Sequence, residues 1–516
     1  MNVSPATAEV ARRLAEGRAA IIWTRLVADL ETPVSAMLKL AAGKPYSFLL
    51  ESVEGGAVRG RYSGIGFAPD LVWRCRDGRA EINRHALVDP HAFVASDQPP
   101  LKSLARLIRD CRMDVPAELP PMSAGLFGYM SYDMVRLMER LPDANPDPIA
   151  IPEAVYMRPT IICVFDNVGD TLTVMTPVWP EPGVAPDAAC AAATARLQQV
   201  VEALGRPLPA GYRADRAPAP TAAPVANMTQ AQFEANVTRA RDYIAAGDAF
   251  QIVPSQRFSV PLQASSFALY RALRRLNPSP FLFHLELDGF ALVGSSPEIL
   301  VRLRGDTVTI RPLAGTRPRG STAAQDEAMA AELLADPKER AEHLMLLDLG
   351  RNDVGRVSEI GSVRVTEQFT IERYSHVMHI VSNVEGKLKP GLEALDALVA
   401  GFPAGTVTGA PKIRAMEIID ELEPQRRSFY AGTIGYFGAN GDMDTCIALR
   451  TALVKDGIMY AQAGSGVVAD SDPTAEWQES CNKARAILRA AEEAGRYAGP
   501  EADGAPAGLR RPAASS

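Results

Sequence analysis

Two pairs of glutamates in this sequence have the residue type and spacing of ligands for a hard metal ion. Glu339 and Glu342 lie three residues apart, and Glu476 and Glu479 repeat that spacing later in the chain. Residues three apart share one face of a helix. Two helices that direct such faces into a common space would offer the carboxylate oxygens that Mg²⁺ prefers. By spacing alone, solvated surface charge is the more common explanation of such pairs.

Both pairs stand near expected helix starts, at Asp336-Pro337 and Asp472-Pro473. In each, the aspartate can cap the helix, and the proline gives up no hydrogen bond in the first turn. Gly350 predicts where the first helix ends. The leucines before it are expected to form an apolar patch: Leu344, Leu346, Leu347 and Leu349. Glu339 also has capping-box spacing and Glu476 would interact with the helix dipole, so both have local alternatives to metal binding.

A glycine- and threonine-rich loop, FPAGTVTGAPK, spans residues 402–412 and precedes an expected helix. Its residues Gly405, Thr406, Thr408 and Gly409 would present bare N–H groups and hydroxyls near a helix N-terminus. Such an arrangement binds carboxylate or phosphate anions. Taken alone the pattern is weak, because loops of this kind are often only structural.

Further candidates lie in the last quarter of the chain. Arg450 is expected in the middle of an apolar strand, where an unpaired guanidinium would be costly, so it needs a carboxylate from the protein or from a ligand. Gly464 and Gly466 would let a ligand approach the backbone closely. Lys483 lies on the helix of the second glutamate pair. Together with His379, the best-placed acid–base candidate in this half, these residues describe a pocket for a small polyanionic carboxylate.

Composition and charge exclude several classes of protein. The 516 residues include 54 Lys and Arg against 61 Asp and Glu, a net charge of −7, and no long basic run, which argues against a nucleic-acid partner. The six dispersed cysteines have no CxxC spacing and indicate reduced thiols. Residues 1–17 lack a signal core and no apolar run reaches the roughly 18 residues of a membrane helix. We therefore expect a cytoplasmic protein with no membrane association.

The order of expected elements predicts an α+β fold. Helices alternate with strand pairs such as 281–296 and 298–316, and residues 47–69 predict another hairpin around Gly55-Gly56, so the pairing should be antiparallel. A Pro- and Ala-rich stretch over residues 206–226 predicts a linker. It separates an N-terminal part, residues 1–205, from a C-terminal part, residues 227–495. Residues 496–516 are expected to be a disordered tail.

Six long motifs carry a resemblance to a known family: GSSPEILVR, RPLAGT, ERAEHLMLLDLGRND, YSHVMHIVS, FPAGTVTGAPK and AGSGVVADSDPTAEWQE. In this order they resemble the chorismate-utilising enzymes over nearly all of residues 227–493. The LLES and RYS elements extend the resemblance into the N-terminal part. The resemblance implies the family's fold, with large antiparallel sheets in a sandwich-like arrangement flanked by helices. It also implies chorismate as substrate and Mg²⁺ as cofactor.

Two positions distinguish the branches of this family. Aminodeoxychorismate synthases typically have a nucleophilic lysine where this chain has Ala314. Isochorismate and salicylate synthases use a lysine base where this chain has Gln251, which cannot act as a base. Both absences point to the branch of anthranilate synthase component I, a lyase of tryptophan biosynthesis in which delivered ammonia is the nucleophile and anthranilate and pyruvate are the products. An aminodeoxychorismate synthase without the lysine and an inactive binding paralogue are the alternatives.

The resemblance also implies roles for single residues. The four glutamates would hold Mg²⁺ against the ring carboxylate of chorismate, chiefly through Glu342 and Glu479. Glu298 would protonate the departing C4 hydroxyl after ammonia attacks C2, and His379 would assist the loss of the C2 proton and of pyruvate. Thr406 is the third catalytic candidate. The expected substrate contacts are Tyr430, Arg450, Gly464, Gly466, Lys483, Gly409, Ala314, Gly315 and Thr316.

The resemblance further implies two partners. None of the cysteines lies in a Gly-x-Cys-x-Gly nucleophile turn, so a separate glutamine amidotransferase subunit should supply the ammonia, in a heterotetramer. The second partner is L-tryptophan, an inhibitor that would bind between the hairpin and the segment NPSPF. The residues expected at this feedback site are Leu50, Glu51, Ser52, Arg61, Tyr62, Ser63, Asn277, Pro278, Ser279, Pro280 and Phe281.

Overall fold

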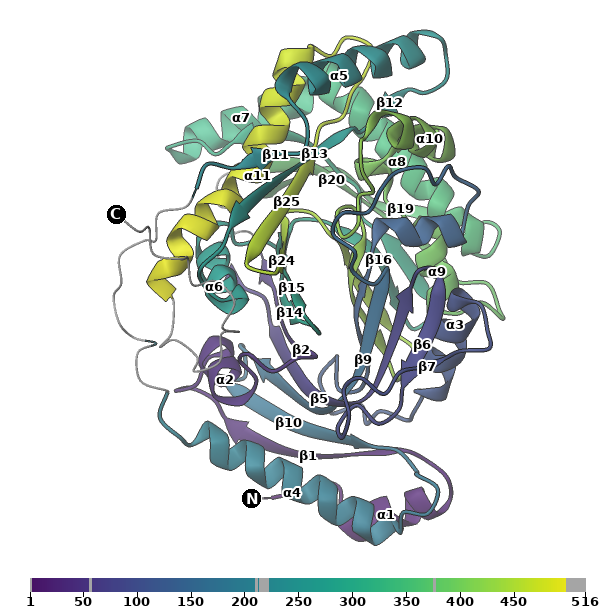
Figure 1. Ribbon diagram of the computed structural model, residues 1–516, viewed down its shortest axis with the longest axis vertical. Coiled ribbons are helices and arrows are strands. Elements are labelled where there is room, and N and C mark those ends of the chain that lie inside the picture. Colours follow the sequence, from purple (N-terminus) through teal and green to yellow (C-terminus); the bar gives the residue numbers. More distant parts are fainter. Residues whose placement is uncertain (1, 55–57, 209–211, 213–221, 375–376, 498–516) are drawn as a thin grey trace, which may run out of the picture.

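The computed structural model describes residues 2–54, 58–208, 212, 222–374 and 377–497 (Figure 1). Most of its strands belong to one 21-stranded sheet, and every strand pair among the described residues is antiparallel. The predicted α+β fold is confirmed. So are two predicted hairpins, β14 (Phe281–Glu286) with β15 (Phe290–Ser296), and β16 (Ile299–Arg304) with β17 (Thr307–Ile310).

The sheet has two wings that the N-terminal strands connect (Figure 1). One wing runs from β11 (Val225–Ala226) through β13 (Ser255–Pro261), β25 (Ile458–Gly464), β24 (Thr451–Lys455) and β15 to β14. The other runs from β22 (Thr433–Gly438) through β23 (Met443–Ile447), β16 and β17 to β20 (Val377–Lys387), which also pairs with β18 (Leu313–Pro318) and β19 (Arg364–Arg373). Four N-terminal strands connect the wings. The first, β2 (Ser47–Glu51), pairs with β14 of one wing and with β5 (Tyr62–Arg76). Strand β5 pairs with β9 (Ala154–Asp166), β9 pairs with β8 (Gly125–Met130), and β8 pairs with β22 of the other wing.

Strands from both predicted parts of the chain therefore share one sheet, and the division at residues 206–226 stays a prediction. Within the predicted linker, residues 209–211 and 213–221 lie outside the described residues, but Val225 and Ala226 form β11 rather than a free linker. Most of the predicted tail, residues 498–516, also lies outside them. The last described residues, Gly495–Tyr497, form a short 3₁₀ helix after α11 (Pro473–Ala494).

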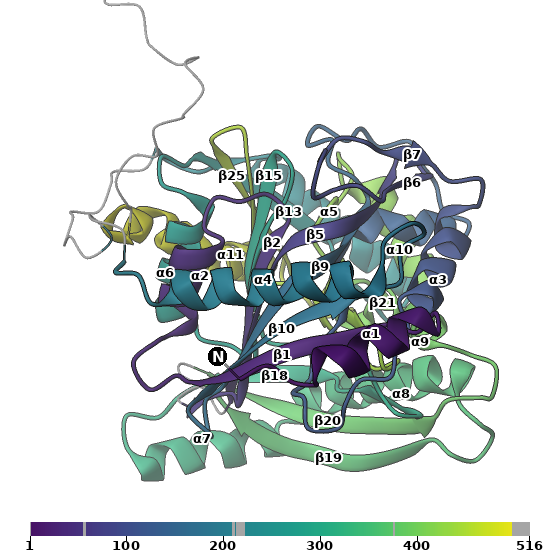
Figure 2. The same cartoon turned by 90° about the horizontal axis from the view of Figure 1, so that it is seen from below.

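Helices cover the outer faces of the sheet. Seen from below, α4 (Pro186–Leu204) and α1 (Thr7–Ala15) lie along β1 (Ala20–Val27) and β10 (Thr171–Val178) (Figure 2). Helices α6 (Ser266–Leu276), α5 (Gln230–Ala245) and α11 pack together on one wing. Helices α8 (Pro337–Val357) and α9 (Ala394–Gly401) pack on the strands of the other. None of the described helices is both long and apolar enough to cross a bilayer.

Large aromatic side chains fill the space where the two wings meet the N-terminal strands. Phe48 of β2 stacks on Phe127 of β8 with ring centroids 4.5 Å apart, and both are almost fully buried. Trp73 of β5 is fully buried and donates a hydrogen bond from its indole N–H to Ser103 at 3.1 Å. This core anchors the edges of both wings, and so it fixes the loops that connect their strands.

Helix α8 begins where the sequence predicts but ends later. The Asp336 carboxylate accepts the N–H groups of Lys338 at 2.9 Å and Glu339 at 3.3 Å, which confirms the predicted cap. The prediction that Gly350 ends the helix is wrong, because the helix continues to Val357. Gly350 is buried against β17, but an added Cβ would lie 3.5 Å from Ile310 Cγ2, an ordinary contact distance, so packing alone does not require glycine there.

The predicted apolar patch of α8 is narrower than expected. Leu346 and Leu347 are buried, and Leu349 approaches Gly405 on the loop of residues 402–412. Leu344, however, is 53% exposed. It lies two residues after Glu342, about 200° further around the helix at about 100° per residue, so it points away from the face that carries the glutamates.

Candidate active site

The two glutamate pairs are presented by α8 and α11. Burial raises the pKa of the Glu342 carboxyl, and the charges of Glu339 and Glu479 raise it further. Electrostatic coupling between Glu342 and glutamates of both helices agrees with the predicted common space. The Gln251 side chain, from the short strand β12 (Gln251–Ile252), donates a hydrogen bond to Glu342 Oε1 at 3.0 Å. An amide thus occupies the position beside Glu342.

The other three glutamates also have polar partners within the protein. Arg317 lies 3.0 Å from Glu339, Lys483 lies 2.6 Å from Glu479, and the Ser471 hydroxyl donates to Glu476 at 2.7 Å. Among the described residues, no three His, Cys, Asp or Glu side chains converge closely enough to hold a metal ion. Any metal bound here would therefore have to compete with Arg317 and Lys483 for two of the carboxylates.

Two of the predicted glycines lie directly against these carboxylates. A Cβ on Gly466 would stand 2.7 Å from Gln251 Nε2 and 3.8 Å from Glu342 Oε1. Gly315 has a positive φ of 68°, and a Cβ there would stand 3.1 Å from Glu339 Oε2. A side chain at either position would fill the space beside the acids. The prediction that Gly464 and Gly466 let a ligand approach the backbone closely stays a prediction.

His379 lies on β20 opposite Thr316 of β18. Its Nδ1 is 2.9 Å from the Gly315 carbonyl oxygen, which can only accept, so Nδ1 carries the proton and Nε2 keeps its lone pair. Burial lowers the pKa of the imidazole to about 4. Tyr374 packs edge-on against the ring with centroids 5.5 Å apart. At neutral pH the ring is therefore uncharged and can accept a proton.

Glu298 differs from His379 in its protonation state at neutral pH. It follows β15, is 6% exposed, and burial raises its pKa to about 8. Its Oε1 accepts a hydrogen bond from the Thr406 hydroxyl at 3.0 Å. Thr406 belongs to the short helix Gly405–Val407 of the predicted anion loop. At neutral pH this carboxyl is mostly protonated, so Glu298 can donate a proton as the predicted acid must.

Arg450 is not in the middle of a strand as expected. It lies in the connection between β23 and β24 with a positive φ of 49°, and its carbonyl accepts the Ser295 N–H at 3.1 Å. Burial lowers the pKa of its guanidinium, and only the Tyr430 hydroxyl acts against this. No carboxylate of the described residues pairs with it. Of the two alternatives left open by the sequence, a ligand carboxylate is the one that fits.

Lys483 connects the remaining predicted residues. Its Nζ donates to the Gly464 carbonyl at 3.2 Å, and a Cβ on Gly464 would stand 3.1 Å from the Tyr430 hydroxyl. The charge of Lys483 opposes the raised pKa values of Glu298, Glu342 and Glu476. It also contributes to the lowered pKa of His379. The charge of Lys483 therefore acts on the candidate acid Glu298, on the candidate base His379 and on two of the glutamates.

The glycine- and threonine-rich loop of residues 402–412 packs against the segment that carries Gln251. Gly409 pairs with Ile252 in the two-stranded sheet of β12 and β21 (Gly409–Ala410) and has a φ of 134°. A Cβ on Gly409 would lie 2.1 Å from the Gln251 carbonyl oxygen, so only glycine allows this approach. Ala314 lies in β18 with its side chain buried. The loop thereby sets the position of Gln251.

Sequence reasoning missed two residues of the site, Arg317 and Tyr374. Arg317 pairs with Glu339 across the packing of β18 on α8. Tyr374 reaches His379 across the turn between β19 and β20, where its N–H bonds to the Val377 carbonyl. Neither contact has a periodic signal in the sequence, because both arise between elements whose relative position is set by packing.

Most of the residues expected at a feedback site line a cavity. Pairing of β2 with β14 places Glu51 opposite Leu282. A cavity of about 640 Å³ is lined by most of the predicted set: Leu50, Glu51, Ser52, Arg61, Tyr62, Pro280 and Phe281. Glu51 pairs with Arg274 at 2.6 Å and accepts the Tyr270 hydroxyl. The same cavity reaches Glu298 and Tyr374.

Four predicted members are not on the cavity lining. Ser63 is buried within β5, where it pairs with Phe165. Asn277 bonds to the Ser295 hydroxyl at 3.2 Å, and residues 278–279 connect it to β14. These residues shape the wall from behind, and the exposed fraction of Ser279 is only 6%.

Comparisons with known proteins identify the family. A sequence profile described as "chorismate binding enzyme" matches residues 51–489. The chain is 56% identical over 482 residues to the protein named anthranilate synthase component 1 of Cereibacter sphaeroides, covering 93% of this chain and 96% of that one. It is 48% identical over 476 residues to the protein of the same name from Pseudomonas putida, covering 90% and 93%.

Two solved structures agree with this result. The crystal structure of anthranilate synthase component I from Streptococcus pneumoniae TIGR4 matches with a TM-score of 0.74 and 36% identity, covering 90% of this chain and 99% of that one. The isochorismate synthase MenF from Escherichia coli matches with a TM-score of 0.68 at 19% identity, covering 94% and 99%, and so shares the fold. The chain belongs to the family of chorismate binding enzymes.

Proposed function

We propose that the chain is the component of an anthranilate synthase that converts chorismate and ammonia to anthranilate, pyruvate and water, the first step of tryptophan biosynthesis. The observation that carries this proposal is the pairing of Gln251 with Glu342 at 3.0 Å, together with Ala314 in β18. Neither residue can serve as a base or as a nucleophile, so the site needs a nucleophile from outside. The names of relatives that are 46–56% identical over at least 90% of the chain support the same activity.

The acid and the base have complementary protonation states. Glu298, with a pKa of about 8, holds the proton that the leaving C4 hydroxyl needs when ammonia attacks C2. His379, with a pKa of about 4 and no hydrogen bond to Nε2 from the described residues, can take the C2 proton as pyruvate is expelled. Two groups whose environments move their pKa values in opposite directions can perform opposite proton transfers at one pH.

The cationic and hydroxyl groups account for binding the substrate carboxylates. Arg450 has no acidic partner among the residues described, and Tyr430 lies beside it with its hydroxyl close to Gly464. Lys483 stands between the acids. Binding a dianionic substrate would satisfy the Arg450 guanidinium, which burial otherwise penalises.

We further propose that the site takes Mg²⁺ through Glu342 and Glu479, with Glu339 and Glu476 in support. Burial and, to a smaller extent, neighbouring carboxylate charges raise the pKa values of Glu342 and Glu476, and a divalent cation bound beside them would favour their charged forms. Bound Mg²⁺ would supply Lewis-acid stabilisation of the substrate carboxylate. The protein's part is to hold the four oxygens near one another and to release Glu339 and Glu479 from Arg317 and Lys483.

Two regulatory and assembly features belong to the same proposal. The designation "component 1" of the relatives supports a partner, which we propose is a separate glutamine amidotransferase that delivers ammonia within a heterotetramer. We propose that L-tryptophan binds in the cavity beside Glu51, whose carboxylate can accept an ammonium group. The reach of this cavity to Glu298 gives a direct route by which a bound inhibitor can affect the acid. A cytoplasmic location and the absence of nucleic-acid and membrane partners stay predictions.

The activity is tested by incubating the purified chain with chorismate, MgCl₂ and an ammonium salt, without any partner. Anthranilate, identified by its fluorescence and mass, is the expected product. An aminated product that keeps its enolpyruvyl group would assign the chain to the aminodeoxychorismate branch. No turnover by folded protein would leave only a binding role. Omitting Mg²⁺ and comparing Glu342→Gln with the parent tests the metal assignment.

A further inference from the structure

We propose that Arg427, held by Glu423, is a positioning residue that fixes both sides of the active site through two backbone carbonyl groups. The inference rests on the proposed function, since it concerns the acid Glu298 and the amide of Gln251. Arg427 lies outside the set of residues expected to touch the substrate. Its guanidinium instead joins two chain segments that carry the chemistry.

The side chain of Arg427 is buried, and each of its three nitrogens donates a hydrogen bond. Its side chain is 1% exposed. Nη1 donates to the Val407 carbonyl at 2.7 Å, and Nη2 donates to the Val253 carbonyl at 2.6 Å. The Glu423 carboxylate accepts from Nε at 3.0 Å and from Nη2 at 2.6 Å. A planar guanidinium with fixed donor directions can hold two carbonyls and one carboxylate in a single arrangement, which a lysine cannot do.

Each carbonyl belongs to a segment with a functional side chain. Val407 follows Thr406, whose hydroxyl donates to Glu298. Val253 lies two residues after Gln251, whose amide donates to Glu342. The Val253 N–H also bonds to the Thr408 carbonyl at 2.9 Å, so the two segments are joined to each other. Movement of Arg427 would therefore displace the hydroxyl that contacts the acid and the amide that contacts the metal-candidate glutamate.

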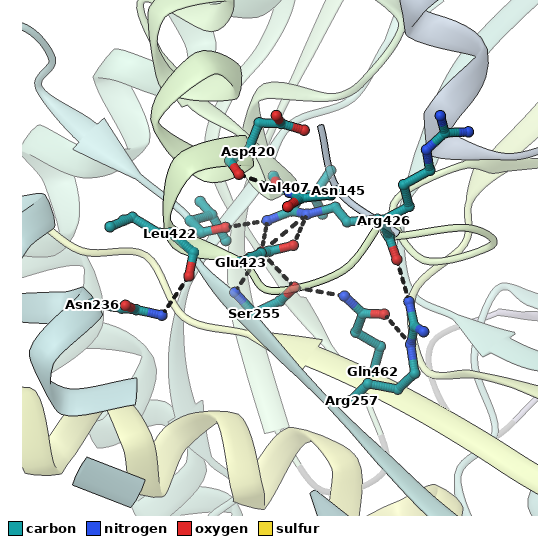
Figure 3. Close-up of polar contacts among 12 residues, drawn as sticks. Asn145, Asn236, Ser255, Arg257, Val407, Asp420, Leu422, Glu423, Arg426 and Gln462 are labelled. Atoms are coloured by element: carbon teal, nitrogen blue, oxygen red, sulfur yellow. Dashed lines mark hydrogen bonds and ion pairs between the residues drawn. The ribbon is translucent and has the colours of Figure 1, made fainter. Parts of the chain in front are cut away.

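Glu423 extends the same support to the strand that carries Gly464. Its carboxylate accepts both the N–H and the hydroxyl of Ser255 at 2.8 Å, and Ser255 pairs with Gly464 across β13 and β25. Figure 3 shows Glu423 at the centre of these polar contacts, with Ser255 and Val407 around it. Gln462 in turn donates to the Ser255 hydroxyl at 2.8 Å. The ion pair is thus the common anchor of three segments that line the site.

A buried ion pair can also be purely structural, so the test needs a readout that stability alone does not move. That readout is the alkaline limb of kcat/KM against pH. Glu298 acts as an acid only while protonated, so activity falls as the pH rises through its pKa. The Thr406 hydroxyl lowers this pKa by donating to the carboxylate, as do the Leu313 N–H and the charge of Lys483, and Tyr374 is a titratable neighbour. Losing the Thr406 contact therefore moves the limb to higher pH.

The experiment compares Arg427→Lys, Thr406→Val and the double variant with the parent chain, using ammonium as the nitrogen source. Thr406→Val is expected to move the limb upward. Arg427→Lys should move it in the same direction and lower kcat about 10- to 100-fold, the range expected when catalytic groups are displaced by about an ångström. The double variant should move the limb no further than Thr406→Val, because both changes remove the same contact.

Arg158→Lys is the matched control. Arg158 is also a largely buried arginine, bonded to Asp70 at 2.8 Å by both Nε and Nη2, but it lies on β9 in the N-terminal part. This variant should lose thermal stability without any movement of the limb. Should Arg427→Lys fail to fold, Glu423→Gln keeps the guanidinium and removes its counter-charge, and a smaller upward movement is expected.

The outcomes separate this inference from the proposed function. An unchanged limb in Arg427→Lys, or in Glu423→Gln where that variant replaces it, overturns the inference if Thr406→Val moves the limb. An unchanged limb in Thr406→Val overturns the assignment of Glu298 as the acid and this inference with it. Additive movements in the double variant also contradict the inference, because they would mean that Arg427 acts by another route.

Discussion

Replacing Glu298 with glutamine is expected to remove activity while stabilising the folded chain. Burial raises the pKa of Glu298 from 4.5 to about 8. A folded-state pKa above the unfolded value means that the neutral acid supports the fold fully below about pH 4.5 and that this support is lost as the pH rises to about 8. At about 1.4 kcal/mol for each pH unit, the buried carboxyl lowers the free energy of unfolding by about 3 kcal/mol at pH 7 and about 5 kcal/mol above pH 8. Glutamine resembles the neutral acid and avoids this cost.

The assay is urea unfolding of Glu298→Gln and the parent at pH 5, 7 and 9, followed by tryptophan fluorescence. The stability difference in favour of the variant should be small at pH 5, grow towards pH 8 and then level off. Glu327→Gln is the control, since that side chain is 78% exposed and should give no such trend. A difference that does not change with pH would refute the claim that burial holds Glu298 protonated, and with it the assignment of this residue as the acid.

Four further predictions concern His379, Arg450 and Glu51. His379→Asn should block the second step, so that an aminated intermediate with its enolpyruvyl group accumulates and is detected by mass spectrometry; unchanged anthranilate formation would exclude His379 as the base. Because the pKa of His379 is about 4, the parent should show no loss of kcat between pH 8 and 6 from protonation of this ring, and a limb near pH 6.5 would contradict that. Arg450→Lys should raise the KM for chorismate by about 10-fold or more with little change in the melting temperature, since loss of one charge-assisted contact costs roughly 1.5–3 kcal/mol; an unchanged KM would remove Arg450 from the binding site. Glu51→Gln should weaken inhibition by tryptophan in an assay of initial rates. It should also lower the free energy of unfolding by about 1–3 kcal/mol, because it weakens the bonds to Arg274 and Tyr270. Full inhibition of the variant would place the feedback site elsewhere.

Local sequence signals predicted elements well where short-range chemistry decides. The Asp336 cap is present because the aspartate needs only the two N–H groups that follow it. The hairpins at β14–β15 and β16–β17 follow from apolar strands around short turns. Gly350 shows the limit of such signals: it lies buried inside a helix that continues to Val357, although glycine is common at helix ends.

The candidate site was predictable in its members but not in its geometry. The motifs include Glu298, His379 and the four glutamates, but not the burial that moves the pKa values of the acid and the base apart. Arg450 was expected in a strand and lies in a connection with positive φ. Its need for a ligand carboxylate follows from burial and from the lack of a described acidic partner, which only packing reveals.

The Arg427–Glu423 pair illustrates what sequence alone cannot supply. The two residues lie four positions apart in the sequence, a spacing shared with exposed pairs such as Arg12 and Glu16. Only the fold shows that one pair is exposed and that the other joins three segments of the site. Long-range contacts between strands that are distant in sequence create this difference, so no local pattern encodes it.

The central claim is that this site takes delivered ammonia rather than activating water or a nucleophile of its own. The most direct measurement supplies ¹⁵N-labelled ammonium, chorismate and Mg²⁺ to the purified chain and follows both products by mass. The expected products are anthranilate that carries one ¹⁵N and an equal amount of pyruvate, with no product in the absence of ammonium. Isochorismate or salicylate formed without ammonium would contradict this claim. The nucleophile would then be water, and the argument that Gln251 prevents the activation of water would be wrong.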